Sequence, residues 1–183
     1  MQTADEVLGL FAGRGGGAYF GESVSMLEHM LQAAHFAEEE AAPPHLVLAA
    51  LLHDVGHFLE DVPADIAEWH SDAKHEELGG RWLAQRFGSQ VSDPVRLHVP
   101  AKRYLCATDA AYFAKLSPAS VITLKLQGGP MSASEVREFE REPFFREAVR
   151  VRTWDDRGKV PDLRTREIGS YKAMIAAAAT RHT

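Results

Sequence analysis

A short stretch at residues 46–57 most constrains what this chain can fold into and do. The uninterrupted apolar run Leu46–Leu52 predicts a buried helix, and it ends directly in His53-Asp54, with Gly56 and His57 following. An imidazole and a carboxylate side by side at a helix end can share a metal ion, and the two carboxylate oxygens can also reach a second ion. A capped helix end with a surface histidine explains the dipeptide equally well, so the assignment depends on residues elsewhere in the chain.

The composition is that of a globular protein with one sizeable core: the chain has 183 residues, of which 45% are hydrophobic and 25% charged. Cys106 is the single cysteine, so an internal disulfide is excluded and a cytoplasmic protein is expected. We find no signal peptide and no apolar stretch long enough to span a bilayer. The net charge of −6 argues against a nucleic-acid-binding surface.

The hydrophobic pattern is helical throughout, without alternating strands, repeats or a linker, and it predicts an all-α fold in a single domain, 1–183. Gly13–Gly17 lacks the strand and the Lys-Ser/Thr of a phosphate-binding loop, so we interpret it as a flexible loop that could act as a lid. Trp154–Lys159 is predicted to be a polar turn. The expected helices lie at 3–12, 23–39, 44–54, 73–87, from Asp93-Pro94 to an interruption at Pro100, 108–116, 119–127, from Ser132 onward and about 165–180.

Several further histidines and acids complete a candidate metal site, each from a different helix or helix end apart from the adjacent pair: His29, His53, Asp54, His75, His98 and Asp155. Four imidazoles and two carboxylates suit iron, manganese or zinc, and they exceed what one ion needs. We therefore predict two ions bridged by Asp54, with His29, His53 and Asp155 on one and His75 and His98 on the other. The alternative is that these histidines are scattered and merely polar.

With these residues in place, the chain resembles the HD-domain superfamily of helical proteins, most of which hydrolyse phosphoesters. It resembles more closely the mixed-valent diiron oxygenases of that superfamily, which cleave carbon–phosphorus bonds. The resemblance covers about Tyr19 to Lys172 and includes Tyr19–Glu22, the block His98–Leu105 and the block Leu126–Met131. The sequence departs from the pattern in a longer loop before His75, which contains Trp69 and His70, and at Phe20 and Pro100.

The resemblance implies an HD-domain helical bundle that holds two iron ions in a mixed-valent Fe(II)/Fe(III) state. It implies a small-molecule partner, a 1-hydroxy-2-aminoethylphosphonate or its N-trimethyl analogue, and dioxygen as co-substrate. The products would be phosphate and glycine or glycine betaine. Tyr19 would occupy an open iron position in the absence of substrate, and Glu22 would pair with the substrate ammonium. Aromatic residues near Glu22 (Phe20 and Trp69) favour the N-methylated substrate, because a trimethylammonium group prefers aromatic faces.

A phosphonate needs cationic and hydroxyl donors, and the following residues are predicted to bind it: His57, Lys102, Ser120, Thr123 and Gln127. The last three are spaced to share one helical face, although a solvated polar stripe would show the same spacing. Two other functions stay open at this point. One is a metal-dependent HD phosphohydrolase acting on a nucleotide or phosphomonoester, which needs only metal-activated water. The other is a module that binds a ligand without turnover.

Overall fold

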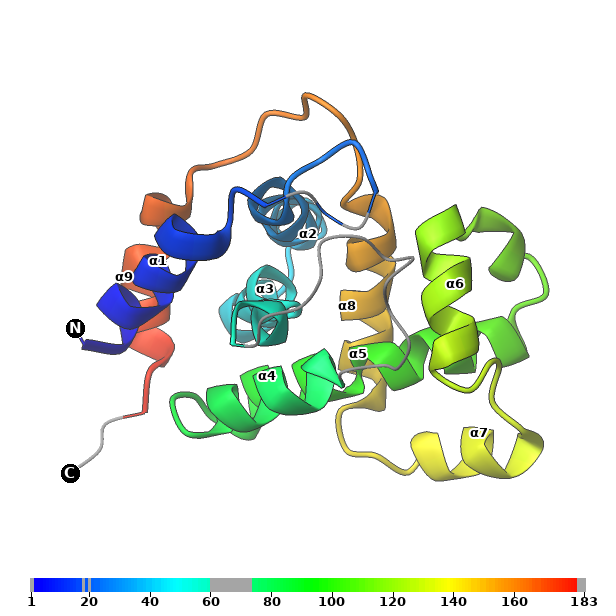
Figure 1. The fold of residues 1–183 in the computed structure, drawn as a ribbon. Helices are drawn as coiled ribbons and strands as arrows, with labels where there is room; N and C mark the ends of the chain where they lie inside the picture. The colour runs from blue at the N-terminus through cyan, green and yellow to red at the C-terminus, as the bar shows by residue number, and fades with distance from the viewer. Residues whose placement is uncertain (1, 18, 20, 60–73, 181–183) are drawn as a thin grey trace.

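The computed structural model describes residues 2–17, 19, 21–59 and 74–180, which form helices joined by loops and no β-strand (Figure 1). This confirms the predicted all-α class. Its α-helices and 3-10 helices (η) are α1 (Gln2–Arg14), α2 (Met26–Glu39), α3 (Pro44–Leu52), η1 (Val55–Phe58), α4 (His75–Ala84), α5 (Ser89–Thr108), η3 (Phe113–Lys115), α6 (Pro118–Leu126), α7 (Ala133–Phe139), α8 (Phe145–Arg157), η4 (Ile168–Tyr171) and α9 (Lys172–Ala178).

Helix α3 lies at the centre of the molecule and carries the run Leu46–Leu52, whose seven side chains are all buried. A helix that is apolar on every side is stable only when neighbours surround it, and here α2, α5, α8 and α9 pack around it (Figure 1). The helix ends at Leu52, so His53 and Asp54 emerge inside the protein rather than at its surface. The fold thereby places the His-Asp pair where other helices can reach it.

Capping residues define the start of two helices. A capping box of Ser132 and Glu135 begins α7, at the predicted start of that helix. A second box, Ser25 with Glu28, begins α2 at Met26, three residues later than the hydrophobic pattern alone indicated. Its backbone and side-chain bonds satisfy N–H groups that a helix start leaves unpaired. The same capped turn fixes the register of His29, one residue after Glu28.

The structure corrects two predicted interruptions. Pro94 and Pro100 lie inside the continuous helix α5, because its packing against α4, α8 and α3 offsets the backbone hydrogen bonds that the two prolines cannot make. Residues 154–157 are the last turn of α8, not a polar turn, and α8 ends at Gly158. Asp155 is therefore delivered by a helix, which fixes its direction towards the interior.

The chain ends complete the core on the side away from α6 and α7 (Figure 1). Helices α1 and α9 pack together, and the buried residues Phe11, Tyr171 and Ile175 belong to the same apolar cluster as α3. The last helix is therefore part of the core. Helix α1 also extends through Gly13 and Arg14, into the stretch predicted to be a loop. A lid function of this stretch stays a prediction, as does a single domain with a core of about 19–172, the extent of the resemblance.

Candidate metal centre

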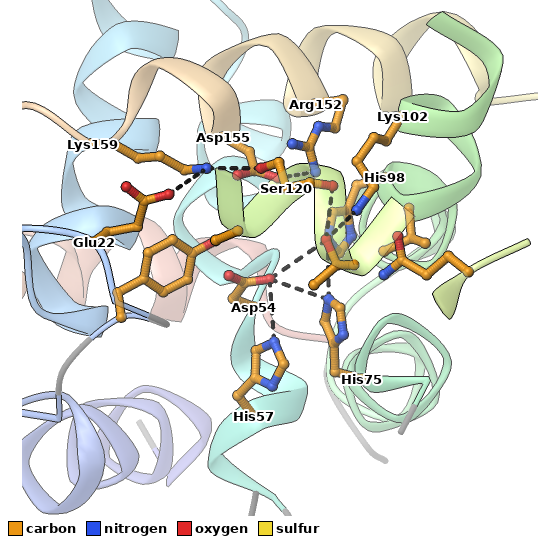
Figure 2. Close-up of a pocket in the computed structure, with 15 residues that line it drawn as sticks. Glu22, Asp54, His57, His75, His98, Lys102, Ser120, Arg152, Asp155 and Lys159 are labelled. Carbon is orange, nitrogen blue, oxygen red and sulfur yellow. Dashed lines mark hydrogen bonds and ion pairs between the residues drawn. The ribbon is translucent and has the colours of Figure 1, made fainter. Parts of the chain in front are cut away.

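Asp54 lies at the centre of the site and is 2% exposed. It follows the end of α3 and begins the short helix η1, so its carboxylate points back into the bundle (Figure 2). Each of its two oxygens faces a different pair of histidines. This is the arrangement needed for one carboxylate to serve two ions.

The first histidine pair is His29 from α2 and His53 from the end of α3. Their Nε2 atoms lie 3.0 Å apart, and they lie 3.5 and 3.4 Å from Asp54 Oδ2. Asp155 from α8 adds a second carboxylate, with its Oδ1 at 3.4 Å from His29 Nε2 and 3.9 Å from His53 Nε2. Two imidazoles and two carboxylate oxygens thus converge on one point.

The second pair is His75, the first residue of α4, and His98 in the middle of α5. Their Nε2 atoms lie 3.3 Å apart, at 3.4 and 3.5 Å from Asp54 Oδ1. His57 Nε2 lies 3.9 Å from the same oxygen. Gly56 permits this approach, because a Cβ atom there would lie 2.0 Å from the His75 carbonyl oxygen. The glycine in the His-Asp motif therefore brings α4 close enough for His75 to reach Asp54.

Backbone carbonyls determine which ring nitrogen of three histidines carries the proton. The Nδ1 atoms of His29, His53 and His98 lie 2.7–2.8 Å from the carbonyl oxygens of Gly158, Ala50 and Val95. A carbonyl can only accept, so each Nδ1 is the donor and the Nε2 lone pair of the neutral ring points into the site.

The groups that meet at the centre are therefore acceptors. Asp54 Oδ2 and Asp155 Oδ1 are buried without a hydrogen-bond partner, next to the inward-facing Nε2 atoms. Buried acceptors facing one another are unfavourable unless a cation lies between them. These lone pairs therefore fit one metal ion on each side of Asp54. Two groups of residues are close enough together to hold an ion: His29, His53 and Asp54, and Asp54, His75 and His98.

The pKa values of two of these histidines shift in opposite directions. Burial opposes a charge on His53, but the Asp54 and Asp155 carboxylates outweigh it and raise its pKa to about 9. Burial lowers the pKa of His98 to about 4, with help from His75 and His53 and against Asp54. A proton on His53 thus supplies the positive charge that a metal ion would otherwise supply. His98 stays neutral at neutral pH, so the lone pair on its Nε2 is available to a metal ion.

A cavity opens over the second pair and is walled by α5, α6 and the end of α8 (Figure 2). The residues predicted to bind substrate all line it: Tyr19, Glu22, His57, Lys102, Ser120, Thr123 and Gln127. Lys102 is 2% exposed, and its Nζ donates to Thr123 Oγ1 at 2.8 Å. The polar face of α6 is therefore turned towards the cavity rather than towards solvent. Phe20 and Trp69 lie outside the described residues.

Two cations in this cavity were missed in the sequence. Arg152 in α8 is 4% exposed, and Lys159 follows the end of that helix. Lys159 belongs to the stretch predicted to be a polar turn, and Arg152 lies two residues before it. Helical spacing indicates Arg152, since Arg152 and Asp155 are three residues apart and share a helix face, whereas Lys159 lies beyond the end of the helix.

Tyr19 and Glu22, which precede α2, line one end of the cavity. The Tyr19 ring stacks on His29, with 3.8 Å between ring centroids, and its pKa is raised well above the ordinary value by burial and by Asp54 and Asp155. Glu22 Oε1 lies 3.4 Å from Lys159 Nζ, which also donates to Ser120 Oγ at 3.0 Å. The carboxylate expected to meet a substrate ammonium thus already faces an ammonium of this chain.

Comparison with known proteins identifies a matching family and two similar dioxygenases. Residues 26–127 match the HD domain model. The chain is 45% identical to the (1-hydroxy-2-(trimethylamino)ethyl)phosphonate dioxygenase (glycine-betaine-forming) of Leisingera caerulea, over 95% of this chain and 89% of that protein. It is 47% identical to the hydroxymethylphosphonate dioxygenase of Gimesia maris, over 87% of this chain and 80% of that protein. Among the described residues, no helix is both long and apolar enough to cross a membrane. The chain therefore belongs to the HD domain family and, within it, to the group that contains these two phosphonate dioxygenases.

Proposed function

We propose that this protein is a dioxygenase that cleaves the carbon–phosphorus bond of a small 1-hydroxyphosphonate at a centre of two iron ions. The observation that carries the proposal is the geometry around Asp54, whose two oxygens each face a separate pair of histidine Nε2 atoms at 3.4–3.5 Å. The two relatives, both named as phosphonate dioxygenases, support the reaction class.

In this proposal His29, His53 and Asp155 hold one ion, His75 and His98 hold the other, and Asp54 bridges them. When bound, iron supplies the redox chemistry with dioxygen that side chains cannot perform. The protein contributes position and charge. Burial and the neighbouring His75 keep the pKa of His57 well below its ordinary value, so His57 is neutral beside the bridge and can form hydrogen bonds without adding charge.

The phosphonate is assigned to the wall formed by α5 and α6. Lys102 supplies a buried cation beside Thr123, and Lys159 supplies a second beside Ser117 and Ser120, at 3.2 and 3.0 Å. An acidic chain with a net charge of −6 repels an anion in general, so a local cationic cluster is required to bind one. The two lysines and the hydroxyl groups of α6 meet this requirement, and they would orient the hydroxyl-bearing carbon towards the Asp54 side.

The end of the cavity next to Tyr19 and Glu22 is where the substituent on the hydroxyl-bearing carbon would lie. Lys159 Nζ lies 3.4 Å from Glu22 and 5.8 Å from the centre of the Tyr19 ring, so a carboxylate and an aromatic ring already stabilise a cation there. We assign a trimethylammonium group of the substrate to this place, with Lys159 leaving Glu22 on its flexible stem and keeping its contacts to Ser117 and Ser120 on the phosphonate side. A substrate without a cation, such as hydroxymethylphosphonate, would leave the pair of Glu22 and Lys159 intact.

The test is turnover of iron-loaded protein with three 1-hydroxyphosphonates, which carry a trimethylammonium, a primary ammonium or no amine. We expect oxygen consumption and phosphate release in equal amounts, and no phosphate release without oxygen. The trimethylammonium compound should be preferred. Phosphate release from a nucleotide or phosphomonoester under anaerobic conditions, with no oxygen-dependent reaction of any phosphonate, would instead identify an HD phosphohydrolase.

A further inference from the structure

Arg152 is the most completely enclosed cation of the described structure outside the assigned ligand and substrate sets. Its Nη1 lies 2.7 Å from Asp155 Oδ2, and its Nε lies 3.1 Å from the Tyr112 hydroxyl and 3.1 Å from Asp156 Oδ2. Its Nη2 pairs with the other oxygen of Asp156. A buried guanidinium needs such a complete set of acceptors, and the set fixes its orientation.

The contact with Asp155 divides the roles of its two oxygens. Oδ2 is taken by Arg152, whereas Oδ1 faces His29 and His53 at 3.4 and 3.9 Å and has no hydrogen-bond partner. Asp155 can therefore offer one oxygen to an ion and cannot turn to offer two. Burial acts to raise the pKa of Asp155, but Arg152, together with His53 and His29, holds it below its usual range, so Asp155 remains ionised.

We propose that Arg152 is a positioning residue that makes the two metal positions electronically unequal. By holding Asp155 Oδ2 it keeps Asp155 a one-oxygen ligand, and its charge reduces the negative charge that the ion beside His29 and His53 experiences. Asp156 shares the same guanidinium and moderates this effect. The proposal rests on the proposed function, because it concerns an iron centre that changes its oxidation state.

A nearby positive charge disfavours the ferric form and raises the reduction potential, because it repels the additional charge of that form. The prediction therefore has a sign. Arg152→Met should lower the midpoint potential of the iron centre, and Asp156→Asn should raise it, since it leaves the Arg152 charge less compensated. Arg152→Lys should lie between Arg152→Met and the wild type.

The measurement is a reductive titration of iron-loaded protein, followed through the EPR signal of the mixed-valent state, with iron content determined for each variant. Arg157→Met is the matched control, because Arg157 lies on the same helix but pairs with Glu40 at the surface, at 2.7 Å and 45% exposed. It should leave the potential unchanged. A general loosening of α8 would move the Arg152 and Asp156 variants in the same direction, whereas the charge effect moves them in opposite directions.

Shifts of equal sign, or no shift in either variant, would overturn the role of Arg152. If Arg152→Met does not fold or does not take up iron, Asp156→Asn decides alone: a raised potential supports the proposal and an unchanged or lowered one overturns it. Wild-type protein that takes up no iron overturns the proposed function and this inference together. Normal iron uptake and oxygen-dependent turnover with unchanged potentials overturns only the inference.

Discussion

Replacing Lys102 by alanine removes the buried cation that we assign to the phosphonate. Lys102 is 2% exposed, lies one helical turn after His98 on α5, and donates to Thr123 at 2.8 Å inside the cavity. Truncating a desolvated cation that faces an anion typically costs ~2–5 kcal/mol. At about 1.4 kcal/mol per factor of ten, this predicts a loss of roughly 30-fold to 4,000-fold in affinity for the phosphonate.

Calorimetric binding of the hydroxyphosphonate under anaerobic conditions measures this loss without turnover. Iron content should stay at the wild-type level, because Lys102 is not among the assigned ligands. Lys125→Ala is the matched control, since it removes the same charge from the exposed side of α6 and should leave the affinity unchanged. An affinity of Lys102→Ala within twofold of the wild type, at normal iron content, would refute the assignment of the phosphonate to this wall.

Three further predictions concern the metal bridge, the close approach of α4 and the amine end. Asp54→Ala should lose both ions rather than one, because each side loses a ligand oxygen; full occupancy by metal analysis would contradict the bridge. Gly56→Ala should deplete mainly the ion assigned to His75, since the new methyl group collides with the His75 backbone; an unchanged metal content would count against this placement. Lys159→Met should increase the preference for the trimethylammonium substrate over hydroxymethylphosphonate, because the competing cation is removed from Glu22; a constant ratio of kcat/KM values would place the ammonium elsewhere.

The central part of the site could be predicted because its signals are local. Leu46–Leu52 is apolar at every position, which requires a buried helix, and the His-Asp pair follows it directly. The assignment of His29 and His98 depended instead on recognising a pattern across the chain. The structure brings the Nε2 atoms of both residues to 3.5 Å from the Asp54 carboxylate.

The surroundings of the site could not be predicted to the same degree. Two prolines concealed the continuity of α5, since only tertiary packing compensates for their missing N–H groups. The polar composition of residues 154–159 concealed the end of α8, and with it Arg152 and Lys159. For His29, the nitrogen that faces the centre is determined by a hydrogen bond from Nδ1 to the carbonyl of Gly158, 129 residues away, and no local pattern contains that information.

Mössbauer spectroscopy of protein loaded with iron-57, before and after addition of the 1-hydroxyphosphonate, tests the two-iron centre most directly. The proposed centre predicts two inequivalent irons in equal amounts, one ferric and one ferrous in the mixed-valent state, with parameters that change when the substrate binds. A single iron per chain, or a spectrum that the hydroxyphosphonate leaves unchanged, would contradict it.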